Sequence, residues 1–136
     1  MATEIFTDTS AWVALVDQHD SLHSTMVNFY PQLLSDWRIW VSTNLVIAES
    51  YTLIRARSTY NASMQFLTLL ENSRRLLKIY SDTSIDGQAE AILRRYKDQD
   101  FSYVDAVSFA VMKNRGIAAA LTFDHHFATA GFNRVI

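Results

Sequence analysis

Hydrophobic and polar positions along the chain follow two periods, which predict short strands separated by longer helices. Short apolar runs predict strands over residues 5–7, 39–41, 76–80, 118–123 and 133–136. Helical spacing of apolar residues predicts helices over about 9–16, 45–58, 61–74, 84–97 and 103–116, and another after Ser21 that Pro31 kinks or divides. Strands that alternate with helices predict an α/β fold, with a mostly parallel twisted sheet of about five strands flanked by helices.

Composition narrows the class of protein. The 136 residues are 49% hydrophobic and 19% charged, which excludes a disordered chain and suits a single domain over residues 1–136. The chain has no cysteine, so disulfide scaffolds, zinc ribbons, iron–sulfur sites and cysteine nucleophiles are excluded. No apolar run approaches the roughly 20 residues of a membrane span, and no signal peptide is apparent. We therefore expect a cytoplasmic protein without a membrane partner.

Two carboxylates follow predicted strands. Asp8 comes after the first strand, and Asp124 comes after the apolar strand that ends at Phe123. In open parallel α/β sheets, ligands bind outside the carboxyl ends of the strands, so both acids are candidates for a site. Each is also a common helix N-cap residue, and this interpretation stays open.

Two further carboxylates lie on apolar helix faces. Leu45 and Leu53 stand four residues before and after Glu49, so a structural ion pair with an arginine is the alternative to a functional role. Asp105 shares its face with Phe109, and it also completes a capping-box pattern that begins at Ser102. Four carboxylates that converge at one sheet edge need a compensating cation, and oxygen ligands favour Mg²⁺ or Mn²⁺ over zinc.

At this point four segments resemble the acidic motifs of PIN-domain ribonucleases, in particular the VapC-like toxins of type II toxin–antitoxin systems. They are Phe6–Ala11, Leu45–Glu49, Ser102–Ala106 and Leu121–Phe127. The resemblance covers the whole chain and includes Gly116-Ile117 and Gly131-Phe132. It implies a PIN-like three-layer fold and a Mg²⁺- or Mn²⁺-dependent endoribonuclease that leaves 5′-phosphate and 3′-hydroxyl ends. It also implies an RNA substrate, an antitoxin partner and a homodimer.

Carried over by motif, the metal-binding and catalytic acids are Asp8, Glu49, Asp105 and Asp124, and the supporting hydroxyls are Ser10 and Thr122. Arg55 and Arg57 end the helix that carries Glu49, and they are candidates for contacts with RNA phosphates or part of a solvated helix face. Consecutive helical residues point about 100° apart, so we expect His125 and His126 to be surface or capping residues rather than a metal site.

The stretch from Tyr60 to Leu77 carries apolar residues that we expect to be exposed and to serve a homodimer or an antitoxin helix: Met64, Phe66, Leu67, Leu69 and Leu70. Proteins that bind nucleic acid usually carry an excess of basic residues, so the formal net charge of −2 argues against such a partner unless some of the acids bind a metal. If four of the fourteen acids hold a metal, ten acids remain against twelve bases, which leaves a mildly basic protein around a negative site.

Two other doubly wound folds with clustered acids fit less well. A phosphoacceptor receiver domain needs paired acids after the first strand and a lysine after a late strand, and neither is present. A haloacid-dehalogenase-like phosphatase needs a second aspartate where Ser10 stands. The alternatives that stay open are a non-catalytic PIN-like module that binds RNA or protein, and an RNA-processing nuclease without an antitoxin. The sequence leaves the RNA target and the number of metal ions open.

Overall fold

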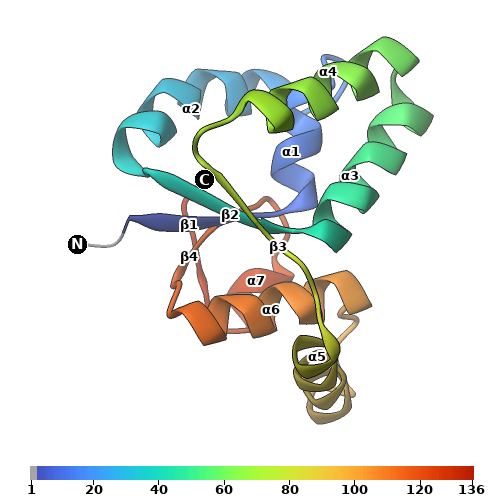
Figure 1. The fold of residues 1–136 in the computed structure, drawn as a ribbon, viewed down its shortest axis with the longest axis vertical. Helices are drawn as coiled ribbons and strands as arrows, with labels where there is room; N and C mark the ends of the chain where they lie inside the picture. The colour runs from blue at the N-terminus through green and yellow to red at the C-terminus, as the bar shows by residue number, and fades with distance from the viewer. Residues whose placement is uncertain (1–2) are drawn as a thin grey trace.

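The computed structural model describes residues 3–136 and contains one parallel sheet with helices on both faces (Figure 1). In chain order the strands are β1 (Glu4–Thr7), β2 (Ile39–Thr43), β3 (Leu76–Ile79), β4 (Ala119–Leu121) and β5 (Asn133–Arg134). Their spatial order is β3-β2-β1-β4-β5, and all four pairings are parallel. Phe6 on the central strand pairs with Val41 on one side and Ala120 on the other. The predicted α/β class and the parallel sheet of about five strands are confirmed.

The helices form two layers. The layer on one face comprises α1 (Thr9–Val16), α2 (His23–Asp36), α3 (Asn44–Arg57) and α4 (Tyr60–Asn72), and the other comprises α5 (Thr83–Arg95), α6 (Tyr103–Arg115) and α7 (His126–Thr129) (Figure 1). The predicted three-layer arrangement is therefore confirmed as well. Among the described residues, no helix is both long and apolar enough to cross a membrane.

Side-chain caps begin the two helices that carry predicted site residues near their starts. The Thr43 hydroxyl accepts a hydrogen bond from the Val46 amide at 3.1 Å and begins α3 directly after β2. Ser102 and Asp105 form a reciprocal capping box at the start of α6, as predicted. Gly116 ends α6 in the left-handed region with φ +67°, where a residue without a Cβ is favoured. These caps place the beginnings of α3 and α6 near the carboxyl edge of the sheet.

Some local features differ from the predictions. Of the two effects predicted for Pro31, a kink or a division of its helix, the division does not occur: α2 continues through Pro31, and Pro31 and Val27, whose carbonyl loses its helical partner, are both exposed to water. The fourth strand ends at Leu121 rather than at residue 123, and the short helix α7 was not predicted. Phe66, which we expected on the surface, is fully buried and packs edge-on against Trp12, because α4 turns this side chain toward α1.

Candidate active site

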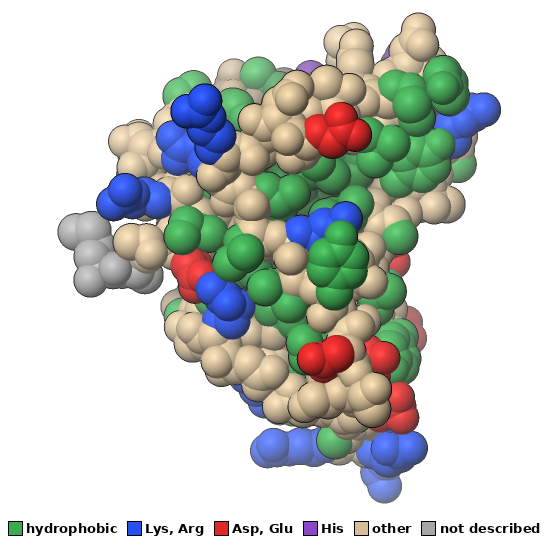
Figure 2. Space-filling model, viewed as in Figure 1, with side chains coloured by type: hydrophobic (Ala, Val, Ile, Leu, Met, Phe, Trp, Pro, Cys, Tyr) green, Lys and Arg blue, Asp and Glu red, His purple; other side chains and the backbone are tan. Residues whose placement is uncertain are grey.

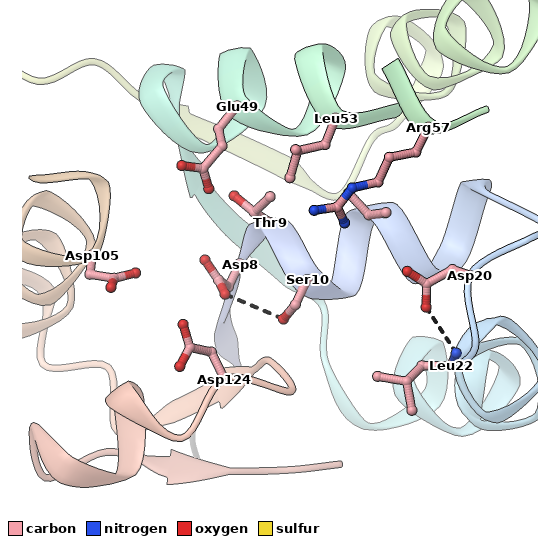
Figure 3. Close-up of a pocket in the computed structure, with 11 residues that line it drawn as sticks. Asp8, Thr9, Ser10, Asp20, Leu22, Glu49, Leu53, Arg57, Asp105 and Asp124 are labelled. Atoms are coloured by element: carbon pink, nitrogen blue, oxygen red, sulfur yellow. Dashed lines mark hydrogen bonds between the residues drawn. The ribbon is translucent and has the colours of Figure 1, made fainter. Parts of the chain in front are cut away.

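The four predicted carboxylates, Asp8, Glu49, Asp105 and Asp124, line one cavity of about 210 Å³ (Figure 3). Asp8 follows β1, and Asp124 lies three residues after the end of β4. These strands are neighbours at the point where the chain reverses its direction across the sheet, which is where α/β sheets bind ligands. Glu49 comes from α3 and Asp105 from the first turn of α6. The structure therefore brings together four acids that are separated by up to 116 residues.

Asp8 is held by two hydroxyl groups that the sequence placed in supporting positions. Its side chain is buried, and Oδ2 accepts hydrogen bonds from Thr122 Oγ1 at 2.9 Å and from Ser10 Oγ at 3.4 Å. Ser10 Oγ in turn accepts a hydrogen bond from the amide of Phe123 at 2.9 Å. Asp8 occupies the N-cap position of α1, as predicted, but its side chain makes no capping hydrogen bond, so the carboxylate is held by the two hydroxyls instead.

Asp105 and Asp124 each combine a local structural contact with a position at the cavity. Asp105 Oδ2 accepts a hydrogen bond from the Ser102 amide at 3.1 Å, which is one half of the capping box. Asp124 Oδ1 accepts from the His126 amide at 2.9 Å, and the Asp124 amide donates to Thr122 Oγ1 at 3.0 Å. The capping-box prediction for Asp105 is confirmed, whereas Asp124 is not the N-cap of α7, which is His125, although its side chain stabilises the turn into that helix. Both structural contacts coexist with a place in the cavity.

In each of the three aspartates, one carboxylate oxygen makes every hydrogen bond found. Within residues 3–136, Asp8 Oδ1, Asp105 Oδ1 and Asp124 Oδ2 have no hydrogen-bond partner. Figure 3 shows the carboxylates of Asp8, Asp105 and Asp124 turned toward a shared space. Each side chain is thus oriented through one oxygen, and its second oxygen is left for a ligand.

Glu49 is only partly buried, and its carboxylate points into the same space (Figure 3). In the described part of the chain it forms neither a hydrogen bond nor an ion pair, so the predicted alternative of a structural pair with an arginine was wrong. Leu53 and Arg57 follow it on the same face of α3 and line the same cavity.

Burial raises the pKa of the Asp8 carboxyl to about 6, and the nearby charges of Asp105 and Asp124 add to this rise. No lysine or arginine within residues 3–136 forms an ion pair with any of the four cavity acids. The free carboxylate oxygens are the donor atoms that Mg²⁺ or Mn²⁺ prefers, and the uncompensated negative charge attracts a cation. The residues present therefore fit a divalent cation of this type.

The two candidate arginines differ in position. Arg57 lines the cavity opposite the acids, together with Asp20 and Leu22 from the connection between α1 and α2 (Figure 3). Arg55 is exposed outside the cavity and lies over the ring of Tyr60 at 5.5 Å. Arg57 follows Glu49 by two helical turns, a spacing from which the sequence could have distinguished it from Arg55. No sequence signal pointed to Asp20 or Leu22.

The two histidines also differ. His125 is on the surface with 77% of its side chain exposed, as predicted. His126 was predicted wrongly, because only 18% of its side chain is exposed and Nδ1 lies 3.2 Å from Asp105 Oδ2 and 3.4 Å from Asp124 Oδ1. Its ring packs edge-on against Phe101 at 5.3 Å. The short helix α7 turns this residue inward, and the sequence analysis did not include that helix.

Comparison with known proteins agrees with this geometry. The chain is 34% identical over 132 residues to the 23S rRNA-specific endonuclease VapC20 of Mycobacterium tuberculosis, a match that covers 96% of this chain and 97% of that protein. The crystal structure of M. tuberculosis VapC20, described as a Sarcin-Ricin loop cleaving toxin, superposes with a TM-score of 0.86 and 32% identity over 95% of this chain and 96% of that chain.

A more distant structure, FitAcB from Neisseria gonorrhoeae, has a TM-score of 0.63 and 16% identity over 96% of this chain and 95% of that chain, which shows the shared fold. The chain is thus a homologue of the endonuclease VapC20. The family model described as PIN domain matches residues 5–133. This protein belongs to the PIN domain family.

Proposed function

We propose that this protein is a Mg²⁺- or Mn²⁺-dependent endoribonuclease that acts as the toxin of a toxin–antitoxin pair. The observation that carries the proposal is the cavity in which four carboxylates converge with one free oxygen on each aspartate. The 34% identity to an endonuclease over almost the whole chain supports it. Acidic sites of this kind serve phosphodiester hydrolysis, because a bound divalent ion lowers the pKa of a water molecule and offsets charge on the phosphate oxygens.

In this mechanism the residues of the chain hold the metal ion and orient the attacking water. The free oxygens of Asp8, Asp105 and Asp124, together with Glu49, would bind the ion. The 2.9 Å hydrogen bond from Thr122 keeps Asp8 in a single orientation, so no rearrangement is needed when the ion arrives. Asp124 is the most solvent-accessible of the three aspartates, with 31% of its side chain exposed, and we assign to it the orientation of the attacking water.

The substrate binds from the side of the cavity opposite the acids. Arg57 is exposed there and unpaired within residues 3–136, so its guanidinium can donate hydrogen bonds to a phosphate that reaches the acids. Hydrolysis by in-line attack on that phosphate leaves a 5′-phosphate and a 3′-hydroxyl. Because VapC20 is named for its action on 23S rRNA, we propose the same RNA as the substrate of this protein.

The test is cleavage of purified ribosomes and total RNA, with new 5′ ends mapped by primer extension. We expect cuts in 23S rRNA with the wild type in Mn²⁺ or Mg²⁺, and none in EDTA or with Asp8→Asn. The control is Asp98→Asn, which removes an exposed acid outside the cavity. Cleavage that survives EDTA or Asp8→Asn would refute the metal-dependent mechanism, and binding without any cleavage would favour the non-catalytic module. Cleavage of another RNA alone would contradict only the proposed substrate.

The antitoxin partner and the homodimer belong to the same proposal. Their support is a second cavity between α4 and β3, which the apolar residues Ile47, Leu67, Leu70 and Leu76 line together with Glu71 and Lys78. Figure 2 shows hydrophobic side chains over β3 on this face, with Lys and Arg side chains beyond α5 at its lower end. Light scattering after size-exclusion chromatography should show a dimer at micromolar concentration, and a monomer would refute the homodimer.

A further inference from the structure

Beside the carboxylate cavity, two histidine rings and one aspartate converge at the beginning of α7. Asp124 Oδ1, His125 Nδ1 and His126 Nδ1 all lie within 4.8 Å of one another. Asp124 Oδ1 is 3.8 Å from the ring nitrogen of His125 and 3.4 Å from that of His126. The two rings are tilted by 54° with centroids 4.5 Å apart, so that both present a nitrogen to the same carboxylate oxygen.

These separations are close to those of ligands around one metal ion. At ligand distances of about 2.0–2.2 Å, neighbouring donors are about 2.8–3.6 Å apart in octahedral and tetrahedral sites. The contact of His126 already has this length, and the exposed ring of His125 needs only a small rotation. Because 77% of the His125 side chain and 31% of the Asp124 side chain are exposed, an ion can enter with its remaining water ligands.

This group is separate from the first cavity, which neither histidine lines. The two sites share Asp124 through different oxygens, because Oδ1 faces the histidines and Oδ2 has no hydrogen-bond partner within residues 3–136. Asp105 Oδ2 is 3.2 Å from His126 Nδ1 and adds a second negative group beside the three ligands. The competing use of His126 is to donate a hydrogen bond to Asp105 without any metal.

We propose that Asp124, His125 and His126 form a second divalent-metal site with mixed nitrogen and oxygen ligands, bridged to the carboxylate site by Asp124. Imidazole nitrogen favours transition metals, so this site should take Mn²⁺ or Zn²⁺ and discriminate against Mg²⁺, whereas the carboxylate site accepts Mg²⁺. A carboxylate bridge of this kind would place two ions in the arrangement used by two-metal nucleases. The proposal goes beyond the nuclease function, and it is tested by metal binding in the absence of RNA.

The experiment uses Mn²⁺ with the purified full chain in an excess of Mg²⁺, which competes with Mn²⁺ for the carboxylate site. Pulsed electron paramagnetic resonance detects ¹⁴N nuclei bonded directly to Mn²⁺, and titration calorimetry gives the Mn²⁺ affinity. The variants are His126→Asn, whose amide can still donate to Asp105, and His125→Asn. The matched control is His19→Asn, because His19 is also 77% exposed and lies 3.5 Å from the carboxylate of Asp17.

We expect a ¹⁴N coupling in the wild type and in His19→Asn, and its loss or reduction in both His125→Asn and His126→Asn. The loss of one ligand should weaken Mn²⁺ binding by about tenfold or more. Circular dichroism verifies that the variants fold, and the exposed position of His125 provides a variant that folding problems should spare. No ¹⁴N coupling in the wild type, or equal Mn²⁺ affinity in the wild type and both variants, would overturn the metal site. RNA cleavage is measured separately, so a failed nuclease assay leaves this result intact.

Discussion

Replacing Asp8 by asparagine should abolish RNA cleavage and, without metal, make the protein more stable at neutral pH. The pKa of this buried carboxyl is raised from 3.8 in the unfolded chain to about 6 in the folded protein. The folded state therefore binds the proton more tightly, and its stability falls as the pH rises from about 4 through 6. Asparagine has nearly the same shape and no charge, so it removes this pH-dependent loss.

The magnitude follows from the shift in pKa. A rise of about two units corresponds to about 3 kcal/mol above pH 7, at 1.36 kcal/mol per unit. The 2.9 Å hydrogen bond from Thr122 lowers the pKa and is already contained in this net shift, so it is not subtracted again. The gain of about 3 kcal/mol should raise the melting temperature by roughly 6–12 °C for a chain of this length.

The assay is thermal unfolding followed by circular dichroism in EDTA at pH 5 and pH 7.5, and then in Mn²⁺ at pH 7.5. In EDTA at pH 7.5, Asp8→Asn should have a higher melting temperature than the wild type. This difference in melting temperature should shrink at pH 5, where the wild-type carboxyl is largely protonated. Mn²⁺ at a hundred times the Kd of the carboxylate site should add about 2.7 kcal/mol to the wild type through that site, a gain that Asp8→Asn should lack. A variant that is less stable than the wild type in EDTA at pH 7.5 would refute the argument about buried charge, and Asp98→Asn controls for net charge.

Further substitutions test the support of the site, the contact with RNA and the stability of two helices. Thr122→Val removes a hydroxyl with three hydrogen bonds and should lower kcat/KM about a hundredfold in cleavage assays. Arg57→Ala should raise KM for RNA at unchanged kcat, whereas Arg55→Ala should change neither in steady-state kinetics. In urea denaturation, Gly116→Ala should lower the free energy of unfolding by about 1 kcal/mol, because φ is +67°. Gly87→Ala in the interior of α5 should instead raise it by up to about 1 kcal/mol.

Those parts of the site that depend on short sequence signals could be predicted. Ser102 and Asp105 are three residues apart, and their capping box begins α6 as their spacing indicated. Asp8 directly follows a short apolar strand, and the parallel pairing of that strand places the carboxylate at the sheet edge. Each of these signals lies within a few residues, so the sequence alone carries it.

The region after β4 could not be predicted, because contacts with distant residues determine its shape. Thr122 and Phe123 continue an apolar run and were assigned to the strand, yet they leave the sheet to bond with residues more than 110 positions away. This departure allows α7 to form and turns His126 toward two carboxylates. A strand predicted to extend through residue 123 leaves out the contacts of Thr122 and Phe123 with Asp8 and Ser10, and no local signal showed that His126 turns inward.

The sequence left open whether each aspartate makes a structural contact or belongs to a functional site. At two of the three positions, the same side chain makes a structural contact and lines the cavity. Asp105 caps α6 through Oδ2, and Asp124 stabilises the turn into α7 through Oδ1. These contacts use one oxygen and orient the side chain, so the second oxygen faces the cavity without any further support. A helix start is a convenient place for such an acid, because the backbone amides there stabilise the ionised form. The local signals that argue for a cap therefore also favour a charged, oriented ligand, and capping is no argument against metal binding in this fold.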